Sequence, residues 1–139
     1  MTKAKKIFQP LSSNEVCQVY ESLLNRKLVS FPLTEEGRNK VESLVVNITN
    51  IYFGKEIYET NEQKAVAYLY FLIKDHPFTD GNKRTAILTF EVLCYMNGLQ
   101  AIYTYHELES IPIFIEKIKE EDHQNVIRKL ATLIFAKFS

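Results

Sequence analysis

Nine residues near the middle of the chain carry side chains suited to phosphate chemistry. Segment 76–84 reads HPFTDGNKR and contains an imidazole, a carboxylate and two cations. Pro77 disfavours helical backbone before it, so a preceding helix should end near Asp75 and hold His76 at the lip of a loop. An imidazole with an ordinary pKa of about 6.5 is largely unprotonated at neutral pH and can accept a proton from an attacking hydroxyl. We therefore predict that His76 is a catalytic base.

The residues after His76 are those that a metal-bound phosphate chain requires. Mg²⁺ typically takes one or two carboxylates from a protein when phosphates and water supply its other oxygens, and Asp80 is the predicted metal ligand. Glycine and asparagine tolerate positive φ, which lets backbone N–H groups turn toward an anion at the start of the next helix. Two cations in the first turn oppose the helix dipole unless an anion is bound. The predicted phosphate- or nucleotide-binding residues are Gly81, Asn82, Lys83 and Arg84.

Each of these residues also has an ordinary structural interpretation. A histidine at a helix end is commonly a cap or a surface residue, an Asp-Gly pair is commonly a turn, and a Lys-Arg pair commonly faces solvent. The occurrence of all of them, in order, within one loop favours a site. We interpret Phe78 as a structural pin, an apolar side chain turned into the core.

Apolar periodicity predicts an all-α protein around this loop. Apolar runs at 65–73 and 87–96 flank it and predict two buried helices. Capping residues and apolar spacing predict helices at 13–25, 34–51, 61–75, 82–97, 108–121 and 123–137. The composition is 46% hydrophobic over 139 residues, without a linker rich in glycine, proline or serine, which indicates one compact domain. We expect a flexible N-terminal tail over 1–12, with lysines at 3, 5 and 6, and a domain over 13–139.

Composition argues against several other classes of function. Seventeen basic and seventeen acidic side chains cancel, so no broad basic face for nucleic acid is indicated. Cys17 and Cys94 lie far apart in apolar segments and are expected to be buried thiols rather than a disulfide or a zinc pair. His106 and His123 lack a ligand partner at helical spacing and are interpreted as surface residues. No signal peptide and no run of about eighteen apolar residues is present, so we expect a cytoplasmic protein that does not enter a membrane.

The central segment resembles the signature of the Fic/Doc (Fido) superfamily, His-x-Phe-x-Asp/Glu-Gly-Asn-Gly-Arg-x-x-Arg. The positions that match are His76, Phe78, Asp80, Gly81, Asn82 and Arg84. Two positions depart from it: Lys83 stands where Fic enzymes have a small residue, and Ile87 stands where their second arginine would be. The run HPFTDGNKRTA is closest to the Doc (death-on-curing) branch.

The resemblance implies an enzyme that uses ATP and Mg²⁺ to modify a Ser, Thr or Tyr hydroxyl of a target protein. Fic enzymes with both arginines typically transfer AMP, whereas Doc enzymes are similar in scaffold but act as kinases. Lys83 fills space near the nucleotide and adds a donor for terminal phosphates, and Ile87 removes a bidentate phosphate clamp. We therefore favour a Doc-like protein kinase over a Fic-type adenylyltransferase. A catalytically silent nucleotide-binding or interaction module is the third possibility.

The same resemblance implies two features outside the loop. Fido domains carry a short β-hairpin flap near the active-site loop that aligns an extended target segment by strand addition. Here the candidate target-docking residues are Phe53, Gly54, Lys55 and Ile57. A helix-to-helix connection whose aromatic residues only cap the core is the structural alternative. Doc systems also imply a separate antitoxin-like regulator, with toxin–antitoxin or virulence roles.

Overall fold

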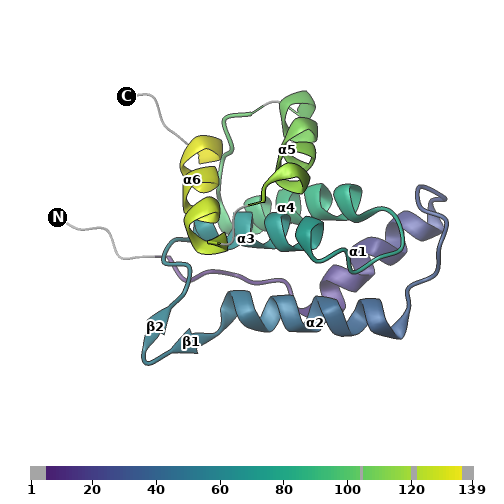
Figure 1. The fold of residues 1–139 in the computed structure, drawn as a ribbon, viewed down its shortest axis with the longest axis horizontal. Coiled ribbons are helices and arrows are strands. Elements are labelled where there is room, and N and C mark those ends of the chain that lie inside the picture. Colours follow the sequence, from purple (N-terminus) through teal and green to yellow (C-terminus); the bar gives the residue numbers. More distant parts are fainter. Residues whose placement is uncertain (1–5, 104, 120–121, 136–139) are drawn as a thin grey trace.

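The all-α architecture is confirmed by a computed structural model, which describes residues 6–103, 105–119 and 122–135. Within these residues the chain forms six helices and one small hairpin (Figure 1). The helices are α1 (Ser13–Asn25), α2 (Glu35–Thr49), α3 (Asn61–Lys74), α4 (Asn82–Asn97), α5 (Tyr105–Lys117) and α6 (His123–Phe135).

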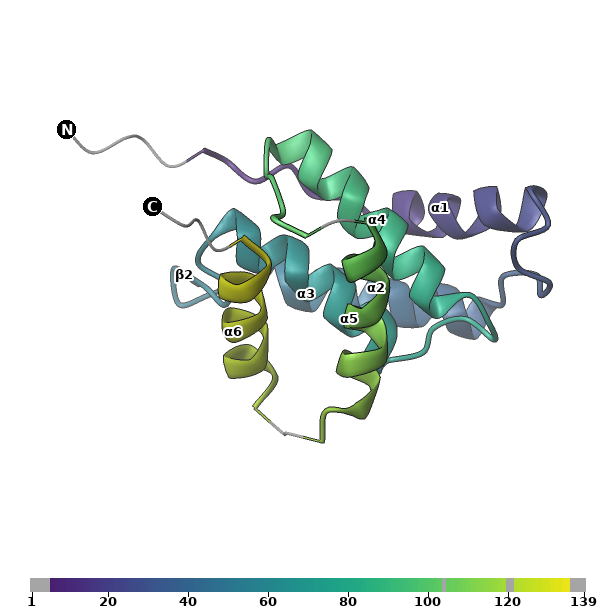
Figure 2. The same ribbon diagram turned by 90° about the horizontal axis from the view of Figure 1, so that it is seen from above.

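Helix α3 forms the centre of the fold. Its sequence is apolar around most of its circumference, and nine of its residues are buried. A helix that is apolar all round must be covered on every side. Helices α2, α4, α5 and α6 all pack against α3, and α4 also contacts α1 and α5 (Figures 1 and 2). The loop that carries the predicted chemistry joins α3 to α4, so it is held between two well-packed helices.

The helix ends explain why two of the predicted ranges match the structure. Helix α1 begins after a capping box, in which Ser12 Oγ accepts from the Glu15 N–H and Glu15 accepts from the Ser12 N–H. Helix α4 lies between Gly81 and Gly98, both of which have positive φ. Helix α5 runs from Tyr105 to Lys117 rather than over the predicted 108–121.

Residues 9 and 11, which lie in the expected flexible tail over 1–12, contact the helical domain. The Asn97 side chain pairs with the backbone of Gln9, accepting from its N–H at 2.7 Å and donating to its carbonyl at 3.0 Å. Leu11 is buried, and its carbonyl accepts from Tyr68 Oη at 2.7 Å. Because one amide satisfies both backbone groups of Gln9, this segment packs without forming a helix or strand. The lysines at 3 and 5 lie outside the described residues.

The predicted hairpin is present, but it does not lie beside the loop. Strands β1 (Ile51–Tyr52) and β2 (Lys55–Glu56) are antiparallel. Phe53 and Gly54 both have positive φ, as a two-residue type I′ turn requires. The hairpin precedes the N-terminus of α3, whereas the loop follows its C-terminus (Figures 1 and 2). At 1.5 Å per residue, α3 separates them by about 20 Å.

Among the described residues, no helix has the length and apolar character needed to cross a bilayer.

Candidate active site

The loop between α3 and α4 is braced by α1 and by the connection that follows α1. Phe78 is 5% exposed, and its ring stacks on that of Tyr20 with centroids 4.1 Å apart and planes at 9°. Tyr20 Oη in turn donates to the carbonyl of Phe31. The structure thus places Phe78 in the core, where it anchors the loop to α1.

Gly81 meets two requirements at the start of α4. Its φ is +77°, which disfavours any residue with a Cβ, and an added Cβ would lie 2.3 Å from Val29 Cγ1. Because glycine has no side chain, no side-chain hydrogen bond caps α4. The first N–H groups of a helix need partners and carry the positive end of its dipole. This helix start is therefore suited to an anion.

Asn82 closes the loop with its side chain. It is 8% exposed, and its Oδ1 accepts from the Phe78 N–H at 3.0 Å while its Nδ2 donates to the Phe78 carbonyl at 2.9 Å. These two hydrogen bonds identify which atom of the Asn82 amide is the oxygen and which is the nitrogen. In this conformation the Asn82 side chain serves the loop, so its backbone N–H is the group left for a phosphate.

His76 is exposed and lies beside this helix start. Its φ of +45° is unusual for a residue with a side chain. Its Nδ1 is 3.4 Å from Asn82 Nδ2, a distance that makes any hydrogen bond weak. Because the amide nitrogen of Asn82 is a donor, we assign the neutral ring its lone pair on Nδ1 and its proton on Nε2. In this assignment the basic nitrogen of His76 lies on the side of the ring that faces the Asn82 side chain.

Asp80 has one carboxylate oxygen without a partner. Oδ2 accepts from the Ser30 N–H at 3.4 Å, while Oδ1 is buried and has no hydrogen bond among the described residues. A buried orphan oxygen is satisfied by a cation or a water, so the residue fits a Mg²⁺ ligand. Because Oδ1 is buried, a cation reaches it only after the atoms around it move. Among the described residues, no cluster of three or more His, Cys, Asp or Glu could hold a metal.

Lys83 already has an acidic partner that the sequence did not reveal. Its Nζ lies 2.8 Å from Oε2 of Glu116 on α5, and both side chains are about half exposed. The Lys83 ammonium lowers the pKa of Glu116, and His76 adds a smaller effect in the same direction. Glu116 is 33 positions away on an ordinary amphipathic helix, so only the packing of α5 against α4 could identify it. Arg84, by contrast, is exposed and makes no ion pair within the described chain.

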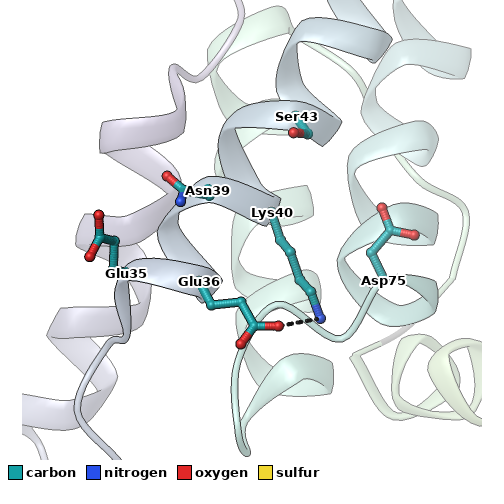
Figure 3. Close-up of a pocket in the computed structure, with 6 residues that line it drawn as sticks. All are labelled: Glu35, Glu36, Asn39, Lys40, Ser43 and Asp75. Carbon is teal, nitrogen blue, oxygen red and sulfur yellow. Dashed lines mark ion pairs between the residues drawn. The ribbon is translucent and has the colours of Figure 1, made fainter.

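An acidic groove lies on the α2 side of the loop. It has a volume of about 600 Å³ and is lined by Glu35, Glu36, Asn39, Lys40, Ser43 and Asp75 (Figure 3). It contains three carboxylates and a single lysine, Lys40, which pairs with Glu36 at 3.8 Å. Burial raises the pKa of Asp75, the last residue before His76. Like charges repel, so this groove disfavours a phosphate chain.

A second groove, of about 440 Å³, begins at Lys83 and lies over α1, α4 and α5. Its cations are Arg26, Lys83 and Arg84. Its apolar residues are Leu23, Leu28, Ile87 and Leu88, and its acids are Glu91 and Glu109. With three cations, two of them beside the start of α4, this groove favours a polyanion. The sequence identified Lys83 and Arg84, but not the residues that α1 contributes.

The candidate docking residues are remote from this site. Phe53 is fully exposed at the tip of the hairpin, Gly54 and Lys55 are also exposed, and Ile57 is half-buried. They lie at the opposite end of α3 from His76.

Comparison with known families agrees with the motif. A model of the Fic/DOC family matches residues 10–94, which is more than half of the chain. The chain therefore belongs to the Fic/DOC family, and this membership supports a Fic-type transferase. Searches of curated proteins and of solved structures found no match.

Proposed function

We propose that the protein is an ATP- and Mg²⁺-dependent transferase that modifies a hydroxyl side chain of a target protein, with phosphate transfer favoured over AMP transfer. The observation that carries this proposal is the position of His76, whose ring lies 3.4 Å from the side chain of Asn82, the first residue of the uncapped helix α4. A base must lie within reach of both the attacking hydroxyl and the phosphate that it attacks. Such transfers depend chiefly on positioning and on charge stabilisation, which this loop offers.

In the kinase reaction, the target hydroxyl gives its proton to the unprotonated nitrogen of the His76 ring while its oxygen bonds to the γ-phosphorus. The bond from the γ-phosphorus to the bridging oxygen breaks, and ADP leaves. In the alternative reaction the same oxygen bonds to the α-phosphorus, pyrophosphate leaves and AMP stays on the target. The α4 N–H groups and Arg84 would stabilise phosphate charge in either case. Asp80 is the residue that would hold Mg²⁺, whose charge would further neutralise the phosphates.

The choice of phosphate transfer rests on Lys83 and Ile87. Lys83 adds a cation beside the helix start, where terminal phosphates need charge compensation. Its present partner, Glu116, is exposed, and exposed ion pairs are weak enough to exchange for a phosphate. Ile87 lines the apolar part of the basic groove rather than offering a second guanidinium. Both features support a site that differs from the AMP-transfer arrangement.

A silent nucleotide-binding module remains the alternative to an enzyme. An intact Lys83–Glu116 pair would withhold this cation from a transferred phosphate and leave the α4 N–H groups and Arg84 to bind a nucleotide. Transfer of label separates the three possibilities.

The test uses ATP labelled at either the γ- or the α-phosphate, incubated with Mg²⁺, the full chain and cell-lysate proteins. Label from γ alone supports the kinase, label from α supports AMP transfer, and binding without transfer supports the silent module. His76→Ala should abolish transfer and leave nucleotide binding nearly intact. His106→Ala, which alters another exposed histidine, is the matched control and should retain transfer. Full transfer by the His76 variant would contradict the assignment of the base.

A further inference from the structure

Helices α5 and α6 leave an open groove between them. Both helices pack against α3, but they stand apart from each other, and no comparable interface joins them within the described residues (Figures 1 and 2). The α5–α6 groove has a volume of about 420 Å³. Its lining residues are Phe114, Lys117, Ile118 and Lys119 on one side and Val126, Lys129, Leu130 and Leu133 on the other.

Each side of the α5–α6 groove is the face of one helix. Positions 126, 129, 130 and 133 follow the i, i+3, i+4, i+7 spacing of a single face of α6, and positions 114, 117 and 118 follow i, i+3, i+4 at the end of α5. Phe114 is 57% exposed and Leu133 is 56% exposed. Large apolar side chains that gather inside a polar rim mark an interaction site, whereas scattered ones do not.

The charged residues that line the α5–α6 groove are all lysines, at 117, 119 and 129. None of them forms a salt bridge with a described residue. Two nearby carboxylates have other partners. Glu116 pairs with Lys83, and Asp122 Oδ1 accepts from the Asn125 N–H at 3.1 Å at the start of α6. The groove therefore combines an apolar strip with a positively charged rim.

We infer that the α5–α6 groove binds an amphipathic helix of a partner protein, with the apolar face of that helix against Phe114, Leu130 and Leu133 and its acidic side chains against the lysines. Two helices that stand apart on a third offer ridges between which another helix can pack, and apolar residues at helical spacing are the usual anchors of such a ligand. The charge of the rim requires the acidic character.

Two other occupants fit these observations less well. A second copy of this chain, related by a two-fold axis, would bring the same three lysines to both sides of the contact, where like charges repel. A membrane surface is broad and would contact the exposed Phe114 and Leu133, but it would not fill a groove whose deeper residues, Val126 and Leu130, are already buried. The inference does not use the phosphate site, so it is independent of the proposed function.

Fluorescence anisotropy with the full chain tests the inference with three labelled, designed 18-residue peptides, a length of about five helical turns. The first has leucines at i, i+3, i+4, i+7 spacing, glutamates beside them and alanines elsewhere. The second has lysines in place of the glutamates, and the third has serines in place of the leucines. The first peptide should bind about tenfold more tightly than either of the others, and its binding should weaken as the salt concentration rises.

Substitutions in the groove locate the binding. Leu133→Ser should weaken binding of the acidic peptide about fivefold, because part of the apolar contact is lost. Val46→Ser is the matched control, since Val46 is 52% exposed on α2 and does not line the groove. Lys129→Glu should weaken binding about fivefold by replacing attraction with repulsion. Lys27→Glu makes the same change of charge at an exposed lysine outside the groove and should have no effect.

The outcomes that would overturn the inference are distinct. Equal binding of the acidic and basic peptides would refute the charge argument, and equal effects of Leu133→Ser and Val46→Ser would refute the location. In sedimentation equilibrium, a dimer that Leu133→Ser converts to a monomer would assign the groove to a second copy. Binding to phosphatidylserine vesicles that Leu133→Ser abolishes would assign it to a membrane. None of these results bears on transfer from ATP.

Discussion

Replacing Gly81 by alanine should destabilise the protein far more than the same change at Gly98. Both glycines have left-handed backbone, which costs an alanine about 1–2 kcal/mol. At Gly98 nothing lies within 4 Å of the added methyl group, whereas at Gly81 it would lie 2.3 Å from Val29 Cγ1. Overpacking of this kind adds about 1–3 kcal/mol. We therefore expect a loss of about 2–5 kcal/mol for Gly81→Ala and of about 1–2 kcal/mol for Gly98→Ala.

Urea unfolding, followed by circular dichroism, measures both losses. A domain of this size has a total stability of about 5–15 kcal/mol, so the Gly81 variant should remain folded but shift clearly. The steric part is tested by Val29→Ala, which removes the clashing methyl groups. The double variant should recover about 1–3 kcal/mol relative to the sum of the single changes. Equal losses at the two glycines, or additive behaviour with Val29→Ala, would refute the claim that Val29 requires glycine at this position.

Four further outcomes follow from contacts in the site. Asn82→Ala should lower the free energy of unfolding by about 2–4 kcal/mol, measured in urea, because both buried backbone groups of Phe78 lose their partner. Glu116→Gln should strengthen triphosphate binding in calorimetry without lowering the melting temperature, because it frees Lys83 from an exposed pair. The folded pKa of Glu116 lies below its ordinary 4.5, so the stabilisation from its pair with Lys83 should be complete above about pH 4.5 and lost as the pH falls through the folded pKa. In an NMR titration of Glu116, Lys83→Met should return this pKa toward 4.5. Burial raises the pKa of Cys94 to about 12, so a thiol reagent at pH 8 should label it slowly in the native chain and rapidly in urea.

The sequence predicted those parts of the fold that depend on local chemistry. Helices α1 and α4 have the predicted bounds because side-chain caps and glycines mark their ends. Helix α5 was harder, because Pro112 lies inside it and its amphipathic pattern does not mark where it starts. The packing of residues 6–12 was missed because it depends on Asn97, 88 positions from Gln9.

The same division applies to the candidate site. Its loop residues share one short segment, and their residue types alone suggested phosphate chemistry. The brace formed by Tyr20 and Val29, and the Lys83–Glu116 pair, arise from tertiary packing that no local pattern encodes. Asn82 shows that residue type alone does not predict what a side chain contacts. It was predicted to bind phosphate or nucleotide from its type alone, and the type did not predict the two hydrogen bonds that its side chain makes with the Phe78 backbone.

The length of α3 sets a spacing rule for any polypeptide that pairs with the hairpin. An extended chain advances about 3.3 Å per residue, so about six residues are needed to cover the 20 Å from the hairpin to His76. A target bound to β1 or β2 would therefore present for reaction a residue about six positions from its paired segment. Lengthening α3 by one turn would move that residue by one or two positions along the target.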